Sequence, residues 1–307
     1  YTHYRFGSEY PKDLADFEMV LEKDLKKANN EKRLAKDKKF WDDQLDALGE
    51  PLYSDIQGPE VLEEARKLHG NEKLRAADIE RKNLFVEVKD YYLEPEPTKN
   101  LIDFCMNHQL SMTNLLLLGI RTYLSKVNNG QEDITIQNFI SRRSTHDEWT
   151  SGGSRTIMFP CRTVISPETE FIAAAYEIQN VQNRIYMHSN YDPALIMEEM
   201  RRRYHTPEHT TYESCYLTYQ PMPVKMDNPY LKCIPQHSKW FANGAATKKM
   251  YLTVSHTEHG GMNFSYHYQT AHLEEHDMEL LYYYMMRILF KGIAEPDMSI
   301  GEIMAQV

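Results

Sequence analysis

Histidines are the side chains of this sequence that first suggest chemistry, because 13 of them occur among its 307 residues. Two pairs are closely spaced, His205 with His209 and His256 with His259. Histidines three or four residues apart bind a metal together when a helix places them on one face. Neither pair falls within a convincing helical pattern, so we expect solvated histidines and no metal site.

The other reactive side chains lack the spacing that catalytic or metal sites need. The four cysteines stand far apart and form no C-x-x-C pair, which predicts reduced thiols without a zinc site or a disulfide framework; they are Cys105, Cys161, Cys215 and Cys233. The G-x-S-x-G elbow, the G-x-x-x-x-G-K-[ST] phosphate loop and the G-x-G-x-x-G dinucleotide motif are all missing. The enzyme classes that depend on these motifs are therefore disfavoured.

Two further clusters admit both a functional and a structural interpretation. The run from Leu280 to Met286 is rich in tyrosine and methionine, and at helical spacing it indicates core packing more than a ligand pocket. The consecutive residues Arg201, Arg202 and Arg203 would attract an acidic protein partner. The favoured interpretation of the three arginines is a solvated helix end that the helix dipole stabilises.

Composition limits the kind of protein that these residues form. A net charge of -10 argues against a protein whose main task is to bind nucleic acid or an anionic membrane, because both need a cationic face. No apolar run approaches the roughly 18 residues that cross a bilayer, and the N-terminus has no signal-peptide pattern. We therefore expect a soluble, cytoplasmic protein, and the first residue, Tyr1, suggests a fragment of a longer chain.

The elements that would position these side chains follow from hydrophobic periodicity, caps and strand alternation. Leu14, Phe17, Leu21 and Leu25 share one face of a first helix, and a second helix carries Phe40, Trp41 and Leu45 and ends before Gly49. Further helices are expected at 60–68, 98–108, 111–128, 193–203, 273–291 and 299–305, and one from Pro167 past Ile185. Strands are expected at 81–92, 133–140, 155–165, 214–220, 233–240, 249–255 and 262–268.

The order of these elements predicts the fold class. Helices separate some of the strands, and the last two strands form an antiparallel hairpin around Gly260 and Gly261. The polar segment 141–154 is predicted to be a loop that connects the strands at 133–140 and 155–165. We expect an α/β fold in which helices pack on a mixed β-sheet.

Several segments, taken in order, resemble the condensation domains of nonribosomal peptide synthetases, which belong to the chloramphenicol acetyltransferase-like superfamily. Residues 39–45, K-F-W-D-D-Q-L, resemble the Trp-containing helix that follows the family's catalytic loop. Residues 110–118, L-S-M-T-N-L-L-L-L, resemble the start of the helix that opens its second subdomain. Residues 133–136 with Arg143 resemble D-V-V-I-G-x-P-V-x-x-R, and 153–162 resemble G-F-F-V-N-T-L-P-L-R, with Pro160 and Arg162 matching.

The resemblance continues to the C-terminus and so covers nearly the whole chain. Residues 188–191, H-S-N-Y, resemble the H-Q-D-Y-P-F-E motif, and Thr218-Tyr219-Gln220, the terminal hairpin and residues 300–303 complete the match. The sequence departs from the family at Ile157, where an asparagine is usual, and at Asp192, where a proline is usual. Because isoleucine cannot make the hydrogen bonds of asparagine, an ordinary amide-forming specificity is in doubt.

The family's H-H-x-x-x-D-G motif does not occur in these residues. By the resemblance it would precede Tyr1, so the chain is expected to be the C-terminal half of a two-subdomain chloramphenicol acetyltransferase-like fold, without its own catalytic residue. Residues 1–97 would be a helical and loop lead-in with the first strand, linking from a missing N-terminal subdomain. Residues 98–307 would be the C-terminal condensation subdomain.

The resemblance also implies partners and site residues. The family joins an acyl or peptidyl donor to an aminoacyl acceptor, both carried as thioesters on the phosphopantetheine arms of carrier protein domains, and no cofactor is bound directly. Arg162 would fix the subdomain interface, Arg143 would brace the neighbouring loop, and His188 would form a structural hydrogen bond. Ile157, Tyr219 and Gln220 would line the substrate tunnel or the interface, and an apolar surface is expected near Arg143, Arg162 and residues 218–220.

Three functions remain open at this point, and an epimerization domain, which shares the architecture, ranks behind them. The chain is part of an amide-forming condensation domain that is inactive alone, or a noncatalytic module that binds a carrier protein, or a standalone acyltransferase of the same superfamily. An H-H-x-x-x-D-G motif upstream would favour the first over the second. Neighbouring genes for adenylation and carrier domains would argue against the third.

Overall fold

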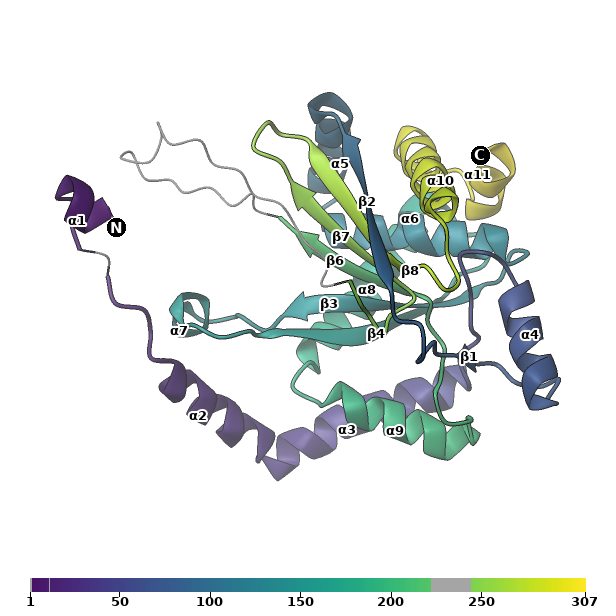
Figure 1. Ribbon diagram of the computed structural model, residues 1–307, viewed down its shortest axis with the longest axis horizontal. Coiled ribbons are helices and arrows are strands. Elements are labelled where there is room, and N and C mark those ends of the chain that lie inside the picture. Colours follow the sequence, from purple (N-terminus) through teal and green to yellow (C-terminus); the bar gives the residue numbers. More distant parts are fainter. Residues whose placement is uncertain (1, 11, 222–243) are drawn as a thin grey trace.

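The computed structural model describes residues 2–10, 12–221 and 244–307, and Figure 1 shows how their helices and strands are arranged. The helices are α1 Thr2–Phe6, α2 Phe17–Ala28, α3 Glu31–Leu48, α4 Glu60–His69, α5 Pro95–Asn107, α6 Met112–Val127, α7 His146–Thr150, α8 Phe171–Met187, α9 Pro193–Tyr204, α10 Glu275–Ala294 and α11 Ile300–Gln306. The strands are β1 Ala77–Asp78, β2 Val86–Leu93, β3 Asp133–Ser141, β4 Thr156–Val164, β5 Thr210–Thr211, β6 Cys215–Gln220, β7 Met250–His256 and β8 Met262–Gln269.

A mixed sheet of six strands organises the chain, in the order β2-β8-β7-β6-β3-β4. β6 runs parallel to both β3 and β7, and the other neighbours pair antiparallel. A second sheet joins the two short strands β1 and β5. Helices on a mixed sheet are the α/β architecture that the order of elements predicts.

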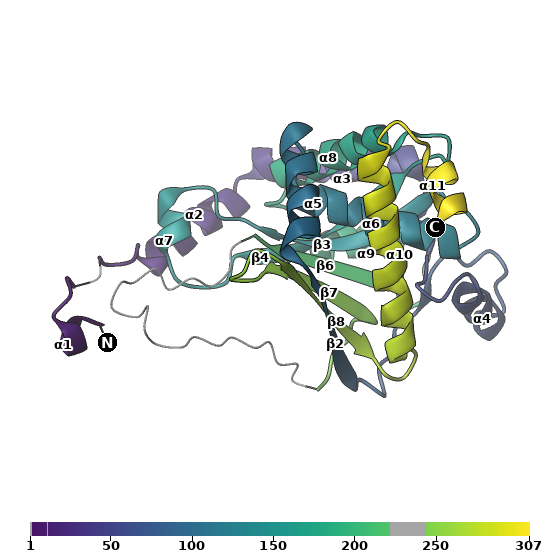
Figure 2. The same cartoon turned by 90° about the horizontal axis from the view of Figure 1, so that it is seen from above.

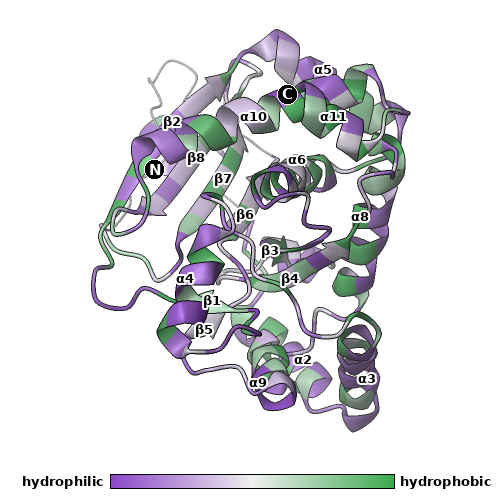
Figure 3. Cartoon of the chain, turned by 90° about the vertical axis from the view of Figure 1, so that its right-hand side faces the viewer, coloured by the Kyte–Doolittle hydropathy of each residue, from purple (hydrophilic) through white to green (hydrophobic). Residues whose placement is uncertain are grey.

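One face of the large sheet is covered by helices, and α6 lies at the centre of that layer. Figure 2 shows α5, α6 and α10 along this face, and Figure 3, viewed almost along α6, shows it enclosed by the sheet, α8, α10 and α11. Of the 16 residues of α6, 13 are buried. The uninterrupted leucines at 115–118 explain this position, because a helix that is apolar all round is stable only when it is enclosed.

Two glycines allow the helices of this layer to approach closely. A Cβ at Gly119 of α6 would lie 2.9 Å from Met285 of α10, and a Cβ at Gly292 of α10 would lie 2.3 Å from the ring of Phe171, the first residue of α8. Both distances are shorter than a carbon contact allows. These positions therefore require glycine for packing.

Most predicted elements are confirmed, and the differences at their ends have local causes. β2 begins at Val86, not at Arg81, because the Glu80 carboxylate accepts the backbone N–H groups of residues 81, 82 and 83 and turns the chain there. α5 begins at Pro95, three residues before the predicted start, because proline suits the first turn of a helix.

The predicted hairpin of β7 and β8 is confirmed, with Val254 opposite Phe264 and Gly260 at a φ of 88°. The predicted connection 141–154 contains a helical turn, α7, in place of continuous loop. Its capping box joins Thr145 to Glu148, a T-x-x-E pattern that was legible in the sequence. The strand predicted at 233–240 lies outside the described residues.

The predicted segments 1–97 and 98–307 contribute to one sheet and one hydrophobic core. β2 belongs to the first segment and pairs along its whole length with β8 of the second. Trp41, Leu45 and Ile56 of the first segment are buried in the same cluster as α6. None of the helices in the described ranges is long and apolar enough to span a membrane.

The apolar side of α2 is exposed, although its periodicity is that of a helix packed against a core. Phe17, Leu21 and Leu25 of α2 keep 42%, 44% and 53% of their surface accessible, and Leu14, which precedes the helix, keeps 72%, whereas Val20 of α2 is buried. α1 also lies apart from the sheet (Figure 1). Periodicity therefore predicts this helix correctly but does not show which side of it contacts the rest of the chain.

We expect Gly292→Ala to lower the free energy of unfolding by about 1–3 kcal/mol, because the added methyl group would overlap the fully buried ring of Phe171. Urea unfolding followed by circular dichroism measures this change. Gly152→Ala is the matched control, because a Cβ there meets nothing within 4 Å. Equal midpoints for the two variants would contradict the close packing of α8 and α10.

Candidate functional site

Arg162 joins the edge of the large sheet to the C-terminal end of α3. Its Nε and Nη2 donate to the two carboxylate oxygens of Asp133 on β3, at 2.8 and 2.7 Å. The same guanidinium donates to the backbone carbonyls of Leu48, Gly49 and Glu50, which follow the last turn of α3. Both charged side chains are largely buried, with 11% and 15% of their surface exposed. Arg162 therefore holds α3 against the edge strand β4.

Arg143 lies two residues beyond β3 and organises the turn that leads to β4. Its guanidinium donates to the backbone carbonyls of Glu148, Ser151 and Gly153. These carbonyls belong to α7 and to the residues just after it. The contacts are all with backbone, so the side chain shapes the connection without neutralising its own charge.

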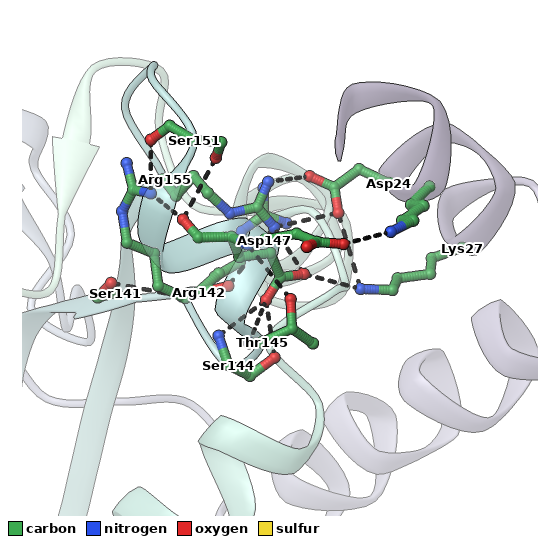
Figure 4. Close-up of polar contacts among 12 residues, drawn as sticks. Asp24, Lys27, Ser141, Arg142, Ser144, Thr145, Asp147, Ser151 and Arg155 are labelled. Carbon is green, nitrogen blue, oxygen red and sulfur yellow. Dashed lines mark hydrogen bonds and ion pairs between the residues drawn. The ribbon is translucent and has the colours of Figure 1, made fainter. Parts of the chain in front are cut away.

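A network of charged groups next to Arg143 attaches α2 to this connection (Figure 4). Arg155 donates to both carboxylate oxygens of Asp24, at 2.5 and 3.1 Å, and to Glu148 at 3.3 Å. Lys27 of α2 also donates to Glu148, at 3.1 Å. Lys23 and Asp147 form a further pair at 2.8 Å.

Glu148 is the most strongly bound carboxylate of this network. It is buried and accepts from the Ser144 backbone, the Ser144 hydroxyl and the Thr145 backbone. Burial by itself raises the pKa of a carboxyl group. The hydrogen bonds from Ser144 and the ammonium group of Lys27 outweigh burial and hold the pKa of Glu148 at about 2.

Positive charge exceeds negative charge where α2 meets the end of β3. Three carboxylates, Asp24, Asp147 and Glu148, are shared among Lys23, Lys27 and Arg155. Within the described residues, Arg142 and Arg143 form no ion pair, and the Nε of Arg142 is buried without a hydrogen-bond partner. This cluster could therefore accept a further anionic group.

His188 connects the end of α8 to α3. Its Nδ1 lies 2.8 Å from a carboxylate oxygen of the buried Asp37, and its ring stacks on Phe40 with centroids 4.1 Å apart. Both partners belong to α3, so the hydrogen bond is made within this chain. Arg203 makes a comparable link from α9, because it pairs with Asp42 and Asp46 of α3.

The remaining predicted site residues are Ile157, on the edge strand β4, and Tyr219 and Gln220, at the end of β6. Ile157 of β4 is opposite Ile140 of β3 and packs against the core. Gln220 ends β6, and the hydroxyl of Tyr219, one residue earlier, lies 2.6 Å from Nε2 of His256 on β7. Burial lowers the pKa of His256 and raises that of Tyr219 to about 12.

The six predicted residues therefore do not gather in one site but lie at separate places in the structure. Arg143 and Ile157 are near the same end of the β3–β4 pair, and Arg162 is near its other end. His188 is beside α3, and Tyr219 and Gln220 are at the end of β6. What sequence reasoning missed is the network of Asp24, Lys27, Glu148 and Arg155, because its members are up to 131 positions apart and carry no common motif.

A small apolar cavity of about 50 Å³ lies beside Arg162, between α3, α8 and α9. Leu45, Ile185 and Met200 are among its lining side chains. Glu213 also borders it, is buried, and accepts hydrogen bonds from Gln137 and Thr211. Burial raises the pKa of the Glu213 carboxyl.

The histidines, cysteines and arginines singled out from the sequence form no reactive centre in the described part of the chain. No group of three or more His, Cys, Asp or Glu side chains there is arranged to hold a metal ion. Burial raises the pKa of the Cys105, Cys161 and Cys215 thiols to about 12, 11 and 12, which makes their thiolates scarce. Arg202 and Arg203 pair with Glu199, which weakens the docking interpretation of the three arginines.

Comparisons with known proteins give one consistent result. The family model described as "Condensation domain" matches residues 1–305. Among solved structures, the first condensation domain of the calcium-dependent antibiotic synthetase has 14% sequence identity and a TM-score of 0.69, over 98% of this chain and 60% of that one. No curated protein sequence matches.

Two further solved structures have similar folds. VibH, described as a condensation enzyme, has 12% identity and a TM-score of 0.69 over 99% of this chain and 65% of its own. The condensation domain of the monacolin K polyketide synthase MokA has 13% identity and a TM-score of 0.72, over 97% of this chain and 66% of its own. This chain thus spans about three fifths to two thirds of the length of the structures that it resembles.

We expect Arg162→Met to lower the free energy of unfolding by about 3 kcal/mol, because it leaves Asp133 and three carbonyls without their donor. Chemical denaturation at pH 7 measures the loss. Arg202→Met is the control, since that side chain is 71% exposed and its loss should cost less than about 0.5 kcal/mol. Similar losses in both variants would refute the structural role of Arg162.

The contribution of Glu148 to stability should depend on pH. Its folded-state pKa of about 2 lies below the ordinary 4.5, so the ionised form stabilises the fold above pH 4.5 and this contribution is lost as pH falls toward 2. Glu148→Gln should therefore destabilise the protein by roughly 1–3 kcal/mol at pH 7 and by progressively less at pH 4 and pH 3. Urea titrations at these three pH values measure the difference.

The exposed Glu72→Gln variant serves as the control for the pH series. Its stability should follow that of the unmodified protein at every pH. A Glu148→Gln difference that stays constant from pH 7 to pH 3 would show that the carboxylate charge is not what stabilises the network.

Proposed function

Because this chain belongs to the condensation domain family, we propose that it forms the C-terminal part of a domain that joins a carrier-bound acyl or peptidyl thioester to the amine of an aminoacyl acceptor. The match of the family model to residues 1–305 supports the condensation function most strongly, and the proposal that the chain is part of a longer domain is supported by its covering 60% to 66% of the solved condensation structures. The ordered motifs and the shared fold support it independently.

The group that handles protons in the reaction is proposed to come from outside these residues. H-H-x-x-x-D-G does not occur in the sequence. Amine attack on a thioester requires removal of a proton from the attacking nitrogen, which a positioned base accelerates by about 10² to 10⁴. We therefore propose that the chain is inactive alone.

The contribution of this chain would be to position the reactants. Alignment of two bound reactants is worth up to roughly 7–11 kcal/mol of the barrier. The donor and acceptor would arrive on phosphopantetheine arms of carrier protein domains, so the cofactor belongs to the partners and not to this chain. Tyr219 and Gln220, at the end of β6, are the residues that we propose for the wall of the substrate tunnel.

Two surface features are proposed to contact the complementary part of the domain. The first is the exposed apolar side of α2, formed by Phe17, Leu21 and Leu25, which together with the preceding Leu14 is more extended than scattered surface residues would be. The unpaired Arg142 and Arg143 lie beside the attachment of α2. Arg162, in contrast, is engaged with α3 and Asp133 of the same chain.

A second candidate function is a noncatalytic module that binds a carrier protein. Ile157 favours it, because this side chain replaces an asparagine that the resemblance places in the family motif. Its packing against the core leaves no hydrogen-bonding group at that position. Under this proposal a carrier protein would bind without any turnover.

The test combines this chain with a separately expressed polypeptide, encoded beside it, that contains H-H-x-x-x-D-G. We expect no amide product from a thioester-loaded carrier and an aminoacyl acceptor with either polypeptide alone, and product from the pair, measured by mass spectrometry. The second histidine changed to alanine in the added polypeptide is the control and should abolish product. Turnover by this chain alone would refute its proposed inactivity, and carrier binding without product from the pair would favour the noncatalytic module.

A further inference from the structure

The face of the sheet opposite α6 carries a group of aromatic side chains across three adjacent strands. Phe139 of β3 and Tyr251 of β7 are in ring contact, with centroids 5.2 Å apart, and Tyr216 of β6 is directly opposite Tyr251 in the strand register. The intervening residues point to the helical layer, as shown by Asn138, which donates to Gln182 of α8. Phe139, Tyr216 and Tyr251 therefore form an aromatic platform on the face away from the helices.

Lys248 lies over this platform. Its Nζ is 5.9 Å from the centroid of Phe139 and 5.4 Å from that of Tyr216. The side chain is half-buried, and no carboxylate in the described part of the chain pairs with it. An amine held against two rings, with no counter-ion among residues 2–10, 12–221 and 244–307, is an unusual environment for a lysine, since lysines are mostly exposed or paired.

The neighbouring residue, Lys249, provides a direct contrast. Its Nζ is 2.7 Å from the Asp55 carboxylate and 3.4 Å from the side-chain oxygen of Gln57. Asp55 is completely buried, so its carboxylate holds the Lys249 ammonium in a fixed position. Two consecutive lysines thus differ in what surrounds their nitrogens.

Two effects oppose each other at Lys248. The ring faces favour the charged ammonium form through a cation–π interaction. Burial disfavours charge, lowers the pKa of Lys248, and leaves more of the neutral amine at a given pH. A desolvated lysine of this kind is a nucleophile toward carbonyl compounds.

We propose that Lys248 is an acylation site of this protein, and that its amine takes an acyl group from a thioester that reaches the platform. The Nζ lone pair attacks the thioester carbonyl, an amide bond forms, the carbon–sulfur bond breaks, and the thiol leaves. The proton lost by the amine passes to the departing thiolate or to water. Neither an oxidant nor a metal is needed for this step.

The identity of the acyl donor rests on the proposed function, whose substrates are thioesters. Attack of an amine on a thioester is also the proposed reaction itself, so Lys248 would act as an acceptor amine that is part of the chain. Acylation would remove the positive charge above the platform and extend its apolar surface. Acylation of Lys248 would therefore change the charge and the polarity of this face of the sheet when a thioester is available.

The test treats the folded, full chain with the thioester S-acetyl-N-acetylcysteamine at pH 7.5 and follows acylation by mass spectrometry. A peptide that contains both Lys248 and Lys249 allows the two initial rates to be compared within one molecule, and the exposed Lys73 serves as the reference for an ordinary surface lysine. We expect Lys248 to react several times faster than Lys249, because the Lys249 ammonium is bound to the Asp55 carboxylate. Lys248 should also react several times faster than Lys73.

Repeating the reaction in denaturant separates the effect of the fold from that of the local sequence. In the unfolded chain, the rates at Lys248, Lys249 and Lys73 should become similar. Lys248→Arg should remove the product at this position and leave the rates at the other two lysines unchanged. The proposal is overturned if folded Lys248 reacts no faster than Lys73, or if its advantage persists in denaturant.

The outcome is independent of amide formation between carrier-bound substrates, because the thioester is supplied as a reagent. If the reconstituted pair forms no amide but Lys248 is still acylated preferentially, the proposed function is refuted and the acylation site stands. If the reconstituted pair forms amide but Lys248 is not acylated preferentially, only the acylation site is refuted.

Discussion

Enclosure of α6 is the constraint on which the rest of the structure depends. Thirteen of its residues are buried, so apolar surface must be provided on every side of the helix. The sheet covers one side, and α8, α10 and α11 cover the others (Figure 3). Because Gly119 and Gly292 allow near contact with Met285 and Phe171, the helices around α6 pack tightly, and within α6 only Thr113, Lys126 and Val127 are partly exposed.

The edge of the sheet depends on charge as well as on packing. β4 is an edge strand, and such a strand presents unpaired backbone groups unless another element covers it. α3 provides this cover, with Trp41 stacked on Phe159 of β4 at a centroid distance of 5.6 Å. Arg162, His188 and Arg203 attach α3 from three separate elements. Of the residues predicted for the substrate tunnel or the subdomain interface, Arg162 and His188 thus bind a helix of the same chain.

α2 differs from α3 because its attachment is mainly ionic. Its charged side binds the β3–β4 connection through Asp24, Lys23 and Lys27, and its apolar side is exposed. Exposed apolar stripes of this kind mark contact surfaces. The unpaired Arg142 and Arg143 beside it give the same region an excess of positive charge, so apolar contact and charge complementarity would act together on a partner.

Local patterns in the sequence determined the elements and the family of this protein. Helix, strand and turn preferences depend on a few neighbouring residues, as in the leucines of 112–127, the alternation of 262–269 and the turn at Gly260. The order of the motifs along the chain then gave the resemblance to condensation domains. Arg143 and Arg162 were identified in the same way, because both stand in recognisable motifs. What such patterns indicate is the type of each element and the side that is apolar.

Tertiary structure alone decided which surfaces meet. Helical periodicity predicts both α6 and α2, yet α6 is enclosed whereas the apolar residues of α2 are largely exposed. The ion pair of Arg155 with Asp24 joins residues 131 positions apart, which no spacing pattern in the sequence indicates. The different surroundings of Lys248 and Lys249 arise from Phe139, Tyr216 and Asp55, which are remote in the sequence. The physical reason is that burial and ion pairing depend on contacts between distant segments, whereas helix and strand preferences are properties of neighbouring residues.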